Sequence, residues 1–212
     1  MADLKAYMIL RVTLDIAPAA MTQHLKKSPA EIELIRAGTA IADVGRYAIR
    51  DAIHVGVHEI DVAMVGRDAM ELETADSFPD AAYRDTGVWF QSGTNTDGAH
   101  NSVTWRQLEG GNILSLNAFP MISEYYSALE RTLFVSDVDL ASLAIWEANV
   151  AAHEYGMSLL KPGISYAKFT DKINAFLQNG ICWNTALLAT DTVLGRWAIT
   201  MDAKQGSSWE KM

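Results

Sequence analysis

The stretch WFQSGTNTDGAHN, which runs from Trp89 to Asn101, decides the fold class that we expect for this chain. It begins with the apolar end of a strand and continues with small, turn-forming and polar residues that lead to His100. An imidazole in a loop beside a strand titrates near neutral pH, so it can both accept and donate a proton. A surface loop with an ordinary histidine has the same pattern, and these residues leave both interpretations open.

A second informative segment, residues 115–132, contains an apolar strand, a turn after Pro120 and another strand. Side chains alternate along a strand, so Tyr126, Ala128 and Glu130 share one face. A phenol and a carboxylate on one face suit a cationic ligand. The alternative is a half-buried strand whose Glu130 pairs with a neighbouring Arg or Lys, and the residues by themselves favour that alternative.

Helical patterns flank these strands. Residues 28–31, Ser-Pro-Ala-Glu, combine a capping serine, a proline at the first helical position and a glutamate three residues on, and apolar spacing continues to about Ile53. The pattern also predicts a short β-like run at 7–14, a helix at 59–73, strands at 88–93, 113–119 and 125–135, and helices at 136–160 and 164–177. Two helices, a hairpin and two more helices make an α+β domain.

The composition bounds the function. With 212 residues and 50% hydrophobic composition, the chain can bury one substantial core. A net charge of −9 argues against a nucleic-acid partner, because phosphate attracts basic surfaces. The single cysteine, Cys182, excludes an intramolecular disulfide framework. No signal peptide and no apolar run long enough for a bilayer are recognisable, so we expect a soluble cytoplasmic protein with no membrane partner.

Both informative segments resemble the creatinase (creatine amidinohydrolase) branch of the pita-bread family, which also contains methionine aminopeptidase and X-Pro dipeptidase. The matching pieces, in chain order, are WFQSGTNTDGAHN, LSLNAFP and YYSALERTLF. The resemblance runs from about residue 17 to 180, and motifs of this length are specific. It implies an α+β pita-bread fold, incomplete in this chain, and a hydrolase.

The resemblance also implies a reaction, the hydrolysis of creatine to sarcosine and urea. His100 matches the catalytic histidine, which acts as general base and then as general acid. Tyr126 and Glu130 match positions in the substrate pocket, where Glu130 would hold the guanidinium by charge-assisted hydrogen bonds. The implied partners are a small guanidino acid as substrate and, in the full-length family, a second copy of the chain; no cofactor is implied.

Metal-dependent relatives carry two aspartates on this hairpin, and alignment on Arg131-Thr132 puts Asn117 and Ala128 at their positions. Neither side chain supplies the anionic oxygen that bridges two divalent ions. The resemblance therefore favours the metal-free creatinase branch. Two other functions stay open: a non-catalytic pita-bread binding module and, more distantly, a relative of the metal-dependent X-Pro peptidases. Retention of His100, Tyr126 and Glu130 favours the enzyme.

The resemblance divides the chain into three parts. Residues 1–27 are expected to be a remnant of an N-terminal domain and its linker, and 28–180 the N-terminal part of the catalytic domain. Residues 181–212 match nothing in the family, and a shifted reading frame yields family-like strings such as FGYGHS, so we interpret them as a frameshift product. We expect the chain as written to be poorly soluble or partly unfolded, and inactive. Coding DNA without an extra or missing base near the Gly180 codon would refute the frameshift.

Overall fold

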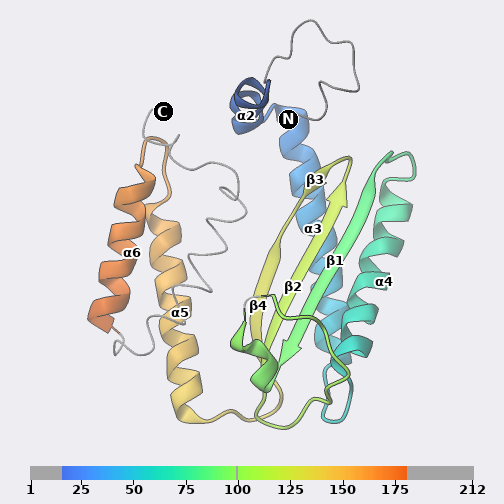
Figure 1. Cartoon of the computed structure of the whole chain (residues 1–212), viewed down its shortest axis with the longest axis vertical. Coiled ribbons are helices and arrows are strands. Elements are labelled where there is room, and N and C mark those ends of the chain that lie inside the picture. The colour runs from blue at the N-terminus through green and yellow to red at the C-terminus, as the bar shows by residue number, and fades with distance from the viewer. Residues whose placement is uncertain (1–15, 99, 181–212) are drawn as a thin grey trace, which may run out of the picture.

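The computed structural model describes residues 16–98 and 100–180 (Figure 1). Two sequence predictions, the β-like run at 7–14 and the frameshifted tail at 181–212, lie outside the described residues. The elements, in chain order, are α2 (Ala17–Leu25), α3 (Pro29–Ala52), α4 (Glu59–Ser77), β1 (Arg84–Ser92), the 3₁₀ helix η1 (Gly93–Asp97), β2 (Ile113–Ile122), β3 (Tyr125–Tyr126), β4 (Leu129–Phe134), α5 (Leu140–Leu159) and α6 (Tyr166–Gly180). This is the α+β arrangement that the sequence predicts.

Strand β2 forms the centre of an antiparallel sheet and pairs with β1 on one side and with β3 and β4 on the other. The single strand expected at 125–135 is divided into β3 and β4, because Pro120 of β2 has no N–H to donate to its neighbour. Ser127 still donates its N–H to the Pro120 carbonyl, at 3.0 Å. The register also stays in phase, with Tyr126 opposite Met121 and Leu129 opposite Ala118.

Helices α3 and α4 cover one face of this sheet and bury the main core (Figure 1). The buried side chains of this core come from both helices, from three strands, from the loop before β2 and from the residue after β4: Ala42, Ile49, Val62, Ala63, Phe90, Leu108, Leu114, Leu116, Leu129 and Val135. Burial of apolar side chains between a helical layer and a sheet is the main stabilising contribution in such a two-layer domain.

Two features fix helix α3. At its N-terminus the predicted capping box is confirmed, because the Glu31 N–H donates to Ser28 Oγ at 3.3 Å and the Ser28 N–H donates to the Glu31 carboxylate. Further along, α3 approaches α4 so closely that a Cβ on Gly66 would lie 2.3 Å from Cγ1 of the fully buried Ile49. The small residue is therefore required by the packing of the two helices.

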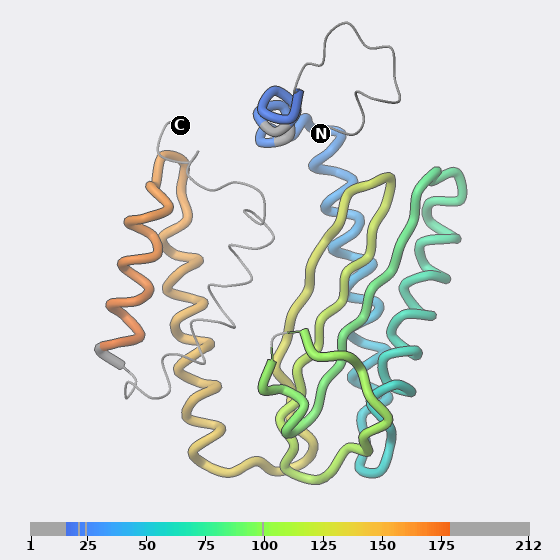
Figure 2. Tube along the Cα trace, viewed as in Figure 1, coloured from blue at the N-terminus to red at the C-terminus, as the bar shows by residue number. Residues whose placement is uncertain are grey.

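Helices α5 and α6 form a hairpin with a small core of their own, made by Ala152, Phe169, Ile173 and Leu177. The side chain of Asp139 caps α5 by accepting from two backbone N–H groups of the first turn. Figure 2 shows the chain passing from the end of β4 into α5 and returning along α6. An edge-to-face contact between Phe134 of β4 and Trp146 of α5 links the hairpin to the sheet, with ring centroids 6.2 Å apart.

The sequence analysis missed two elements, α2 and η1. Helix α2 lies in the segment interpreted as a remnant of an N-terminal domain and its linker, and η1 lies inside the loop that leads to His100. Among the described residues, no helix is long and apolar enough to cross a membrane.

Candidate active site

The sheet face opposite α3 and α4 carries the residues that the sequence analysis singled out. Strand register places Glu130 of β4 directly opposite Asn117 of β2, and Asn117 opposite Trp89 of β1. Residues opposite one another on neighbouring strands project to the same face. These three residues therefore form one row across the sheet, with Asn117 in its centre.

His100 lies against this face. Its imidazole contacts the indole of Trp89, with ring centroids 4.4 Å apart and planes tilted by 36°. The ring of Phe119 completes the group, 5.3 Å from Trp89 and 6.4 Å from His100, edge-on to both. The loop that carries His100 leaves β1 through η1, at the end of the sheet where β1 finishes (Figure 1). The structure therefore brings His100 to the row that contains Glu130.

Tyr126 lies in a different row of the same face, opposite Met121, which lies opposite Asp85. Its phenol donates a hydrogen bond to Asp85 Oδ2 at 2.7 Å, and the side chain is about half exposed. This bond, together with partial burial and the negative charge of Asp85, raises the pKa of Tyr126, so the phenol stays protonated at neutral pH. Along β2, this row is four residues from the row of Asn117 and Glu130.

The amide of Asn117 has a fixed orientation. Its Nδ2 donates to the backbone carbonyl of Trp89 at 3.5 Å and to Ser115 Oγ at 3.3 Å, while the residue is fully buried. A carbonyl can only accept, so the nitrogen must face Trp89 and the Oδ1 atom must point elsewhere. Oδ1 is buried and receives no hydrogen bond from any of the described residues. The side chain thus offers one neutral acceptor.

A metal pair does not fit these residues. Asn117 is neutral and already uses its amide nitrogen on Trp89, and Ala128 has no donor atom. Ions such as Mn²⁺ or Mg²⁺ prefer carboxylate oxygens that are negatively charged and able to bridge. Within residues 16–98 and 100–180, three or more His, Cys, Asp or Glu side chains nowhere gather closely enough to hold an ion.

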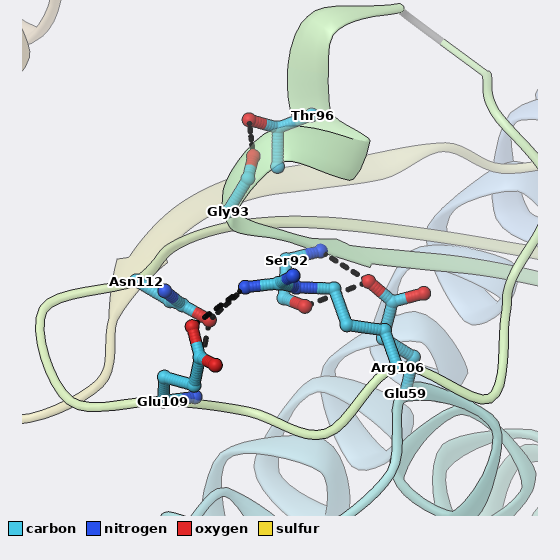
Figure 3. Close-up of polar contacts among 7 residues, drawn as sticks. All are labelled: Glu59, Ser92, Gly93, Thr96, Arg106, Glu109 and Asn112. Atoms are coloured by element: carbon cyan, nitrogen blue, oxygen red, sulfur yellow. Dashed lines mark hydrogen bonds and ion pairs between the residues drawn. The ribbon is translucent and has the colours of Figure 1, made fainter.

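The sequence analysis missed Glu59, the first residue of α4, which is fully buried. Figure 3 shows its carboxylate accepting hydrogen bonds from the backbone N–H and from the hydroxyl of Ser92, at the end of β1. Both hydrogen bonds measure 2.7 Å. An acidic residue in the first turn of a helix is common on electrostatic grounds alone, so the sequence gives no signal that this glutamate reaches the His100 loop.

A second cluster of polar side chains stabilises the last part of this loop, before the chain enters β2. Arg106 donates to Glu109 at 2.9 Å and to Asn112 at 3.3 Å, and the Glu109 N–H donates to Asn112 at 3.1 Å (Figure 3). Asn112 lies directly before β2. Hydrogen bonds therefore fix the loop both where it leaves β1 and where it enters β2.

A model of metallopeptidase family M24 matches residues 33–196, which is most of the chain and extends past residue 180. The creatinase of a Bacillus species is 49% identical over 160 residues, which cover 76% of this chain and 39% of the relative. An uncharacterized hydrolase/peptidase of Sinorhizobium fredii is 30% identical over 153 residues, which cover 71% and 37%. The chain thus spans less than two fifths of the length of these curated relatives.

Solved structures agree on the fold. The prolidase from Pyrococcus furiosus superposes with a TM-score of 0.70 at 20% identity, over 77% of this chain and 47% of that one. Aminopeptidase P from Escherichia coli gives 0.71 at 19% identity, over 84% and 41%. The match over residues 33–196, the 49% identity and these superpositions agree, and the chain therefore belongs to metallopeptidase family M24, with its pita-bread-type fold.

Proposed function

We propose that the complete protein hydrolyses creatine to sarcosine and urea, with His100 as general base and acid and without a metal ion. The observation that carries the proposal is the contact between His100 and Trp89, in the row that ends at Glu130. The 49% identity with a creatinase supports the choice of substrate. By the resemblance to the family, we also propose a cytoplasmic homodimer.

The guanidinium group of creatine is a planar cation that presents only hydrogen-bond donors. Glu130 would bind it through charge-assisted hydrogen bonds. The Oδ1 atom of Asn117, which has no donor of its own, would accept a further N–H once the site opens to the ligand. The phenol of Tyr126 is committed to Asp85 as a donor and would offer only its lone pairs, which suits the same cation.

The reaction then needs one group that moves protons. Neutral His100 would take a proton from water as the oxygen attacks the guanidinium carbon. The imidazolium would next donate that proton to the sarcosine nitrogen, and the carbon–nitrogen bond would break. The new hydroxyl group would pass its proton to the freed amine, so that urea leaves neutral and sarcosine leaves with a protonated amine. Water supplies the oxygen and both hydrogens, so the histidine returns to its neutral form.

Metal-independence rests on Asn117 and Ala128, the two residues aligned with the metal-binding aspartates. Without their carboxylates the hairpin has no bridging ligand, and polarisation of the substrate falls to hydrogen bonds and to charge. An X-Pro peptidase, which would need the bridging ligands, has no support from this donor set.

A chimera tests the proposal. The segment of Bacillus creatinase that this chain matches is replaced by the corresponding residues of this chain, and the hybrid is assayed with creatine and with an X-Pro dipeptide. We expect urea release and no dipeptide cleavage. A folded hybrid that releases no urea, or that cleaves the dipeptide when Mn²⁺ is added, would contradict the proposal.

A further inference from the structure

We infer that Glu59 is a positioning residue, which holds the loop of His100 in place by hydrogen bonds on both sides of that histidine. This inference rests on the proposed role of His100, but it concerns the geometry of the loop and can be tested separately. The residue belongs to α4, far from His100 in sequence.

The carboxylate of Glu59 accepts from residues on both sides of His100. On the near side, Ser92 donates its N–H and its hydroxyl to Oε1, both at 2.7 Å, and the Asn95 amide donates to Oε2 at 3.0 Å. On the far side, Thr104 donates its N–H at 2.9 Å and its hydroxyl at 2.6 Å to Oε2. One side chain therefore joins the part of the loop before His100 to the part after it.

The far side of the loop has other supports. Backbone hydrogen bonds join it to the segment before α4: Glu59 N–H to the Arg106 carbonyl at 2.9 Å, and Leu108 N–H to the Val57 carbonyl at 2.8 Å. The ring of His58 also stacks on Trp105, with centroids 4.2 Å apart. Thr104 and its neighbours are thus anchored even without the carboxylate.

The near side depends on Glu59 much more. Helix η1 is short, and its residue Asn95 is linked to α4 by the carboxylate. Among the described residues, the other hydrogen bonds of η1 stay within the loop and β1, such as those from Gln91 Nε2 to the carbonyls of Asn95 and Gly98 at 3.1 and 2.9 Å. We therefore expect loss of the carboxylate to release η1 and His100 from the fixed frame of α4.

The chemistry of the site explains why a carboxylate is used. Burial of a charged group is costly, and only several good hydrogen bonds offset it. Here donors reach both oxygens, and the position at the start of α4 adds the favourable end of the helix dipole. A glutamine would keep only one acceptor oxygen. Its NH₂ group would replace the other oxygen and face N–H and O–H donors that it cannot accept from. Asparagine and aspartate have shorter side chains and would not reach both parts of the loop.

The test uses the 212-residue chain, its Glu59→Gln variant and a matched control, Asp61→Asn, which removes an exposed acid from the same helical turn. NMR measures the cross-relaxation between the ring protons of His100 and Trp89, and His100→Gln assigns the signals. We expect Glu59→Gln to lose this cross-relaxation and the control to keep it. A folded Glu59→Gln variant that keeps the ring contact would overturn the inference.

Asn95→Ala covers the case in which Glu59→Gln does not fold. It removes the link from η1 to the carboxylate, together with the bond from the Asn95 amide to the Ser102 carbonyl at 3.1 Å, and leaves the bonds of Ser92 and Thr104 to Glu59 in place. We expect the cross-relaxation between His100 and Trp89 to weaken while the melting temperature stays near that of the parent chain. An unchanged ring contact in Asn95→Ala would also overturn the inference.

Kinetics in the creatinase chimera separate the two proposals. We expect Glu59→Gln to lower kcat for creatine at least tenfold with little change in KM, because displacement of the base affects the reaction more than binding. If the parent chimera releases no urea while the NMR contact still depends on Glu59, the proposed function fails and this inference stands. If the chimera is active and Glu59→Gln changes neither kcat nor the contact, this inference fails and the proposed function stands.

Discussion

The imidazole of His100 lies on the indole of Trp89, with ring centroids 4.4 Å apart, and this contact connects a long loop to strand β1 of the sheet. Trp89 belongs to β1 and faces Asn117 of β2, which in turn faces Glu130 of β4. The sheet thus determines where the His100 imidazole would transfer a proton in the proposed reaction.

The first prediction concerns Trp89. Replacement by leucine removes the aromatic support of His100, a contact worth about 0.5–1.5 kcal/mol beyond simple burial. We expect Trp89→Leu in the creatinase chimera to lower kcat about tenfold, since about 1.4 kcal/mol corresponds to a factor of ten. Steady-state urea release measures this effect. Phe134→Leu, which loses an aromatic contact away from His100, is the control and should keep nearly full kcat.

The second prediction concerns pH. A hydrogen bond from Tyr125 at 2.5 Å, followed by bonds from Ser28, lowers the pKa of Glu31 to about 2 from a usual 4.5. The folded state therefore prefers the ionised carboxylate, so its stabilising contribution is complete above about pH 4.5 and is lost as the pH falls toward 2. We expect the decrease in melting temperature across this range to be smaller in Tyr125→Phe than in the parent chain.

Tyr83→Phe is the matched control for this experiment, because Tyr83 is an exposed tyrosine for which no hydroxyl bond is found among the described residues. Its acid dependence should equal that of the parent chain. An identical acid dependence in Tyr125→Phe and the parent would show that the bond between Tyr125 and Glu31 does not contribute to stability.

The third prediction concerns the packing of α3 on α4. A Cβ on Gly66 would meet Cγ1 of Ile49, which is fully buried and cannot move aside. We expect Gly66→Ala to lower the free energy of unfolding by about 1–3 kcal/mol, the usual cost of overpacking. Gly110→Ala, where the added methyl group meets nothing within 4 Å, should change it little. Urea denaturation measures both.

A double variant checks the mechanism of this loss. Ile49→Ala alone leaves a cavity, and in combination with Gly66→Ala the new methyl group partly fills it. The combined loss should therefore be smaller than the sum of the two single losses. Additive losses would show that the two residues are not coupled.

The fourth prediction concerns metals. Because Asn117 and Ala128 provide no bridging carboxylate, we expect the chimera to keep its rate of urea release after dialysis against a strong chelator. A metal-dependent prolidase treated in the same way serves as the control and should lose activity. A loss in the chimera that Mn²⁺ or Co²⁺ restores would refute metal-independence.

The sequence predicts most of the fold, and the exceptions have physical causes. Helix α3 was predicted to within a residue at each end, because Ser28 and Glu31 form a local capping box. Strand β1 begins at Arg84, before the predicted start at Val88, because pairing with β2 extends it through polar residues and Gly87 that carry no strand pattern. The last predicted strand is also divided into β3 and β4, opposite Pro120 of the neighbouring strand β2.

The site was predictable only where its residues lie in one motif. His100 and Glu130 stand in recognisable segments. The register places Glu130 in one row with Trp89, and the ring of His100 contacts Trp89. The bond from Tyr126 to Asp85 and the bonds from Glu59 to the loop join residues far apart in sequence, and no local pattern announces such pairs. The roles of His100, Tyr126 and Glu130 in catalysis and binding remain predictions.

Replacement of His100 tests the central claim most directly. In the creatinase chimera, His100→Ala should lower kcat for creatine about 10²–10⁴-fold, the usual contribution of a general acid–base group. The variant should keep the melting temperature of its parent within a few degrees, since His100 is exposed. Undiminished urea release by a folded His100→Ala chimera would contradict the account.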